Sequence, residues 1–122
     1  MEITEEQVDA IYNSAVNTND PFAKELYFNL LKAFDQPLLL LKLLIHSNLP
    51  LTPLVLFQSI HDCLYLKKTG EIAKIIDAVV EKLGNFETHK LLNQTLELEQ
   101  TVMPGSHKPT FDQVRHFILV LN

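Results

Sequence analysis

The most reactive-looking group of side chains in this sequence is the run His61-Asp62-Cys63. A cysteine beside a histidine can form a thiolate nucleophile. Catalytic partners usually come from distant parts of a chain, however, and consecutive helical residues point in different directions. Cys63 also shares an apolar stripe with Leu56 and Ile60, where a small thiol packs as an ordinary hydrophobic side chain. We therefore predict that Cys63 belongs to the core and that no catalytic centre lies here.

The five histidines form no recognisable metal-binding pattern. The sequence has no H-E-x-x-H segment, and its single cysteine excludes a zinc site made of several thiolates. Asp112 and His116 are four residues apart and could share a metal ion, although a surface ion pair is the commoner meaning of that spacing. We therefore predict no metal site.

Acid–base and phosphate chemistry also lack candidate residues. The carboxylate pairs Asp77 with Glu81 and Glu97 with Glu99 are each expected on a helix, and neither places two carboxylates in one cleft. The three glycines form neither G-x-G-x-x-G nor G-x-x-x-x-G-K, the loops that bind phosphates. The sequence predicts no catalytic residue, no cofactor and no enzyme.

Helix-start signals and apolar periodicity define the elements that carry these residues. Thr4 and Gln7 have the spacing of a capping box, and Asp20-Pro21 and Thr52-Pro53 each place a proline directly after an N-cap residue. Apolar residues then recur at helical spacing. The predicted helices cover residues 4–16, 21–35, 38–45, 53–68, 71–83, 88–102 and 110–122.

The run from 38 to 45 is apolar almost all round, with Lys42 as its one interruption. A membrane-spanning helix needs ~20 apolar residues, so this run is too short. We predict a central core helix, with Lys42 reaching solvent along its aliphatic stem. Leu40, Leu43 and Leu44 also match the L-x-x-L-L pattern of coactivator-docking helices, but burial would make that motif unavailable.

The fourth and fifth helices carry predicted end signals. Lys67 and Lys68 are expected in the last turn of the fourth helix, where cations complement the helix dipole. Gly70 is expected to supply the left-handed residue after that helix, and Gly84 to end the next one.

The composition predicts a folded chain, and the helical periodicity without strand alternation predicts an all-α one. With 122 residues, 47% of them hydrophobic and 20% charged, the sequence fits a single domain over residues 1–122. Short connections favour a compact bundle or a short, solenoid-like stack of about seven short antiparallel helices. Helical hairpins recur with the period of tetratricopeptide-like arrays, but the consensus residues of those repeats are absent, so no family is assigned.

The net charge of −5 and the single arginine, Arg115, argue against binding to nucleic acid, which needs a basic face. The acidic start of the chain differs from a signal peptide, and one cysteine suits a reducing compartment. We expect an intracellular protein, cytoplasmic or nuclear, with no membrane insertion.

Apolar side chains off the buried stripes are the best candidates for a binding surface. Residues 21–35 are expected to bury one apolar stripe, which leaves Tyr27 and Phe28 on another side. The stripe consists of Phe22, Ala23, Leu26, Leu30, Ala33 and Phe34. The candidate partner-binding residues are Tyr27, Phe28, Tyr65 and Leu66, with Asp77 and Glu81 selecting a basic partner by complementary charge.

These features predict a small protein–protein interaction module, such as an adaptor, a regulatory subunit or a subunit of a complex, that binds through an exposed helix face or groove. One alternative is a helical-repeat-like RNA-binding protein or ribonucleoprotein subunit, which would require several lysines to converge on one face. Those lysines are Lys24, Lys32, Lys67, Lys68 and Lys74. A symmetric homodimer is a further alternative.

Overall fold

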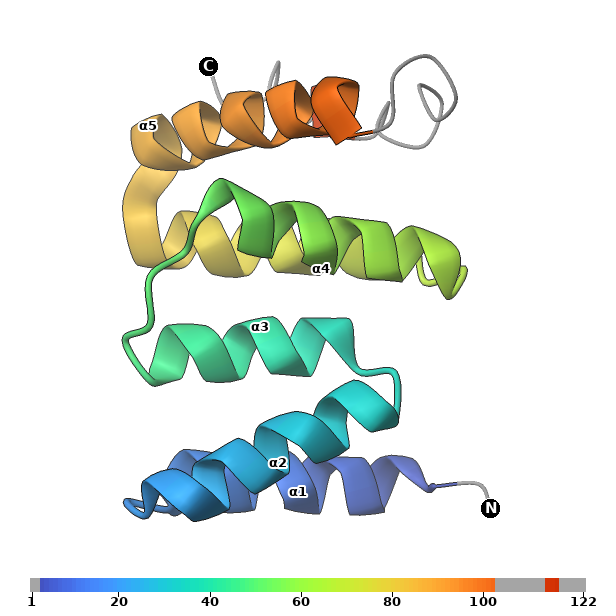
Figure 1. Cartoon of the computed structure of the whole chain (residues 1–122), viewed down its shortest axis with the longest axis vertical. Coiled ribbons are helices and arrows are strands. Elements are labelled where there is room, and N and C mark those ends of the chain that lie inside the picture. The colour runs from blue at the N-terminus through green and yellow to red at the C-terminus, as the bar shows by residue number, and fades with distance from the viewer. Residues whose placement is uncertain (1–2, 103–113, 117–122) are drawn as a thin grey trace. The chain divides into compact units, whose positions relative to one another are not determined.

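The computed structural model describes residues 3–102 and 114–116, and all regular structure in this part of the chain is helical (Figure 1). The helices are α1 (Glu5–Asn17), α2 (Pro21–Ala33), α3 (Pro37–His46), α4 (Pro53–Tyr65) and α5 (Gly70–Val102). Residues 114–116 add one helical turn. The all-α prediction is confirmed, whereas most of the seventh predicted helix, 110–122, lies outside the described residues.

The chain forms two compact units, Met1–Pro50 and Leu51–Asn122. The first contains α1, α2 and α3, and the second contains α4 and α5. This division does not test the predicted single domain over 1–122, because two compact units can belong to one domain.

Helices α1, α2 and α4 begin where the sequence signals place them. The Gln7 backbone N–H donates to Thr4 Oγ1 at 3.2 Å, and the Thr4 N–H donates to Gln7 Oε1 at 2.9 Å, which completes the capping box. The Asp20 carboxylate caps α2, and the Thr52 hydroxyl caps α4 by accepting from the Val55 N–H at 3.2 Å. These caps satisfy N–H groups that the first helical turn leaves open.

The core of the first unit corrects the predicted face of α2. Its buried cluster consists of Val8, Ala15, Leu31 and Leu43. Phe22 and Leu26 are 81% and 57% exposed, so the predicted burial is wrong for these two residues, while Leu30 is partly buried. Apolar residues surround most of α2, so the helical periodicity is compatible with burying either of two faces. Packing against α1 and α3 selects the face that carries Leu31.

Helix α3 confirms the prediction of a buried core helix. Leu41 and Leu43 are fully buried, and the other apolar residues of α3 are at least partly buried. Lys42 is half-buried, as expected for a lysine whose stem runs along apolar surface. None of the helices in the described ranges is both long enough and apolar enough to cross a membrane.

The end of α4 differs from the sequence expectation. The helix stops at Tyr65, and Lys67, with φ of 59°, supplies the left-handed residue instead of Gly70, which begins α5. The Lys68 N–H donates to the Cys63 carbonyl at 2.7 Å, and the Lys67 N–H donates to the Leu64 carbonyl at 3.2 Å. This is the Schellman pattern, and it places both lysines beyond the last turn.

Gly84 divides α5 into two arms. Its φ of 84° and ψ of 169° are not helical, and the ribbon doubles back there (Figure 1). A residue with a Cβ would be strained in this conformation, which confirms the prediction that Gly84 ends the first arm. With α5 counted as two arms, the described residues form six helices and one helical turn, close to the seven predicted.

The second unit is built around α4 packed on α5. The buried apolar residues of α4 are Leu56, Phe57, Ile60 and Cys63. Those of α5 are Ile72, Ile75, Ile76, Val79, Leu91 and Leu92. The inward face of α4 leaves its opposite face available for a site.

Candidate functional site

The run His61-Asp62-Cys63 separates onto different sides of α4. Cys63 is fully buried, which confirms the core prediction. Burial raises the pKa of its thiol to about 12, with further raising contributions from the carboxylates of Glu71 and Asp62. The thiolate, which is the nucleophilic form, is therefore scarce near neutral pH.

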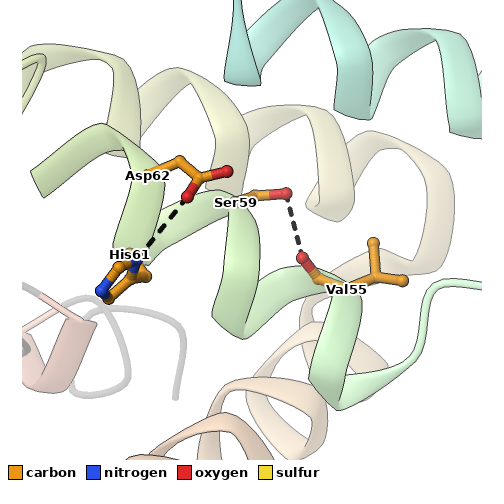
Figure 2. A network of polar contacts seen from close by, with 4 residues as sticks. All are labelled: Val55, Ser59, His61 and Asp62. Carbon is orange, nitrogen blue, oxygen red and sulfur yellow. Dashed lines mark hydrogen bonds and ion pairs between the residues drawn. The ribbon is translucent and has the colours of Figure 1, made fainter. Parts of the chain in front are cut away.

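His61 and Asp62 remain near the surface and contact each other. His61 Nδ1 lies 3.6 Å from Asp62 Oδ1, and the two side chains are 40% and 42% exposed (Figure 2). The Ser59 hydroxyl is occupied locally, because it donates to the Val55 carbonyl one turn earlier at 3.0 Å (Figure 2). These polar groups therefore form local contacts along α4.

Three rings stack along the same face of α4. The ring centroids of Phe57 and His61 are 6.2 Å apart with planes inclined by 17°, and those of His61 and Tyr65 are 6.5 Å apart with planes inclined by 10°. The spacing of four residues places successive rings one turn apart on one side of the helix. The row begins in the core, where Phe57 is buried, and ends at Tyr65, which is 79% exposed.

An open hollow of about 480 Å³ lies beside this row of rings. It is lined by Leu54, Phe57, Gln58, His61 and Asp62. We call these five residues together with Tyr65 the α4 surface.

The α4 surface combines apolar walls with a few polar groups. Leu54 is 61% exposed, so an apolar side chain of a binding molecule could cover it and gain from removing that area from water. The Gln58 amide can donate and accept hydrogen bonds, and the Asp62 carboxylate can only accept them when ionised. This chemistry suits recognition of a partially apolar ligand.

No group of three His, Cys, Asp or Glu side chains in the described ranges could hold a metal ion. His116 is exposed, while Asp112, its predicted companion, lies outside the described residues. His89 Nδ1 is instead 3.3 Å from the Asn93 amide nitrogen on α5.

The candidate binding residues predicted from sequence fall at different places. Tyr27 and Phe28 are partly buried and pack against the core cluster of the first unit. Tyr65 lies at the exposed end of the row of rings, and Leu66, the C-cap residue of α4, is partly buried. Tyr65 and Leu66 are neighbours in sequence at the end of α4, and the structure does not bring them together with Tyr27 and Phe28, which belong to the first unit.

The two predicted acidic contacts, Asp77 and Glu81, are exposed on the first arm of α5. Their spacing of four residues places them on successive turns of one helix side. They do not line the hollow, whose carboxylate is that of Asp62.

The lysines of the RNA-binding alternative belong to both units. Lys24 and Lys32 lie on α2 in the first unit, whereas Lys67, Lys68 and Lys74 lie in the second. Lys68 Nζ is 4.0 Å from Glu71 Oε2. A carboxylate beside a lysine weakens the attraction of that lysine for phosphate.

A second unusual group is the carboxylate of Glu99, on the second arm of α5. Its side chain is 1% exposed, and among the residues that the structure describes neither carboxylate oxygen has a hydrogen-bond partner. Arg115 Nη2 lies 3.8 Å from Glu99 Oε2. The pair joins α5 to the helical turn at 114–116 and gives the buried Glu99 carboxylate a partner of opposite charge.

Sequence reasoning found Tyr65 but missed the rest of the α4 surface. The signal was present in the spacing of Phe57, His61 and Tyr65, which repeats an aromatic or imidazole ring every four residues. His61 is adjacent to Cys63 in sequence, but on a helix its side-chain neighbours are the rings of Phe57 and Tyr65, four residues before and after it.

No protein-family model, curated protein or solved structure matches this chain. Function is therefore inferred from the residues and geometry of the two units.

Proposed function

We propose that this protein is a non-enzymatic protein–protein interaction module, an adaptor or a subunit of a regulatory or other complex, and that it binds a protein partner through the α4 surface. The observation that carries the proposal is the row of stacked rings beside an open hollow, with Leu54 and Tyr65 both largely exposed. Aromatic and aliphatic side chains that remain in water on one helix face are typical of binding surfaces.

The position of the surface on a helix supports this proposal. Leu56 and Ile60 anchor the opposite face of α4 in the core, which fixes the orientation of the outward residues. A rigid helix presents its contacts with little loss of conformational freedom on binding. Helix-face recognition of this kind uses apolar anchors spaced three, four or seven residues apart.

The test is affinity purification of the tagged full-length chain from its own cell type, with and without nuclease, followed by mass spectrometry. Tyr65→Ser and Leu54→Ser remove apolar contacts from the α4 surface. Phe86→Ser is the matched control, since Phe86 is also 79% exposed and lies in the second unit but outside that surface. Circular dichroism establishes that each variant is folded.

A stoichiometric partner protein that survives nuclease, disappears with Tyr65→Ser and Leu54→Ser, and remains with Phe86→Ser would support the proposal. A partner that all three variants retain would show that the α4 surface is not used. Copurifying RNA, with proteins that dissociate on digestion, would favour the RNA-binding alternative instead.

A further inference from the structure

The α4 surface carries a single unbalanced formal charge. Asp62 is the only Asp, Glu, Lys or Arg residue between Pro53 and Tyr65. Its carboxylate borders the hollow and is 42% exposed, and His61, 3.6 Å away, balances its charge only when protonated. A bound molecule with a cationic group would therefore meet a complementary charge at the edge of a hollow whose other lining residues are apolar or uncharged polar, apart from His61 when it is protonated.

Tyr65 adds a second contact for the same cation. It follows Asp62 by three residues, and side chains at that spacing are neighbours on a helix surface. His61 stacks against Tyr65, yet 79% of Tyr65 remains exposed. A guanidinium group can stack on an aromatic ring while its N–H groups donate to a carboxylate, which an ammonium group does less well.

Other occupants fit this surface less well. A symmetric contact centred on the α4 surface of two copies would bring two Asp62 carboxylates together between chains that each carry a net charge of −5. Nucleic acid would bring phosphates to a helix with no lysine or arginine. A basic and partly apolar protein segment would bring neither a second carboxylate nor phosphate groups to Asp62.

We infer that the α4 surface receives a partner segment with adjacent leucine-like and arginine side chains, an inference that rests on the proposed function. The apolar side chain enters the hollow beside Leu54 and Phe57. The arginine guanidinium lies between the Asp62 carboxylate and the exposed ring of Tyr65.

The direct test uses two defined peptides, acetyl-leucyl-arginine amide and acetyl-leucyl-citrulline amide. Citrulline keeps the shape of arginine but is neutral. Each is titrated into the ¹⁵N-labelled full chain, and amide chemical shifts are followed. We expect the arginine peptide to shift amides of residues 54–66 and to bind about threefold or more tightly than the citrulline peptide, the size typical of one exposed ion pair with a cation–π contact.

Two charge-neutralising variants localise the effect. Asp62→Asn should abolish the preference for arginine over citrulline. Asp9→Asn, the matched control, makes the same change at an exposed site on α1 and should retain the preference. Equal affinities for both peptides, shifts centred outside residues 54–66, or an unchanged preference in Asp62→Asn would overturn the inference.

Different results would contradict the arginine contact and the proposed function. If a captured partner depends on Tyr65 and Leu54 but binds Asp62→Asn as tightly as wild type, the proposed function stands and the arginine contact is wrong. If the arginine peptide binds as described but no partner depends on Tyr65 or Leu54, the proposed function is wrong.

Discussion

The buried ion pair of Glu99 and Arg115 gives an asymmetric prediction for stability. The Glu99 side chain is 1% exposed and its carboxylate makes no hydrogen bond within the described ranges, whereas the Arg115 side chain is 34% exposed. Removing the Arg115 side chain leaves the Glu99 carboxylate buried away from water without its charge partner. Removing the Glu99 carboxylate leaves Arg115 partly exposed, so its guanidinium can be solvated by water. Arg115→Met should therefore destabilise the fold much more than Glu99→Leu.

The expected magnitudes follow from that geometry. Breaking a buried pair from one side costs ~3–5 kcal/mol, and we expect ~3 for Arg115→Met because the guanidinium is partly exposed. The separation of 3.8 Å exceeds the ~2.7–2.9 Å of a charge-assisted hydrogen bond, so the attraction between the two charges does no more than balance the desolvation of the carboxylate. Glu99→Leu, alone or combined with Arg115→Met, should stay within ~1 kcal/mol of wild type or be more stable.

Urea unfolding followed by far-ultraviolet circular dichroism measures these differences. Glu97→Leu is the control, because Glu97 is exposed on the same arm of α5 and undergoes the same substitution. The reasoning would be refuted if Arg115→Met changed the free energy of unfolding by less than ~0.5 kcal/mol. It would also fail if Glu99→Leu cost as much as Arg115→Met, since the pair would then contribute strong net attraction.

Three further predictions concern the left-handed cap, the buried thiol and the inward face of α2. Lys67→Gly should stabilise the protein by ~1 kcal/mol, because glycine adopts φ of 59° without the steric cost of a Cβ. Thermal unfolding measures this change, and an unchanged or lower unfolding midpoint would contradict it. The pKa of Cys63 rises from 9.0 to about 12 on burial, so the unfolded chain loses this proton first and stability should fall between pH 9 and 12, by up to ~1.4 kcal/mol per pH unit. Urea unfolding at pH 8 and pH 10 should show a smaller decrease for Cys63→Ala than for wild type, and equal decreases would refute this. Leu31→Ala should lower the free energy of unfolding by ~2–5 kcal/mol, whereas Phe22→Ser should lower it by less than ~0.5 kcal/mol. Chemical denaturation measures both values, and comparable losses would show that α2 packs through its other face.

Part of the candidate site was predictable because it depends on one helix alone. The start of α4 follows from Thr52 and Pro53, and the spacing of its rings follows from helical geometry. The hollow beside the rings was not predictable, because its lining depends on how the side chains of α4 pack in the folded second unit. Tyr65 was found from sequence because it lies off the apolar stripe of Leu56, Ile60 and Cys63.

The sequence by itself determined the helical class, the caps at Thr4, Asp20 and Thr52, and the break at Gly84. Each depends on interactions within a few residues, so the local chain contains all the information needed. Only the tertiary structure decided that Phe22 of α2 faces water. Both faces of α2 are apolar, and the difference in free energy between burying one and the other arises from side chains of α1 and α3 that are distant in sequence.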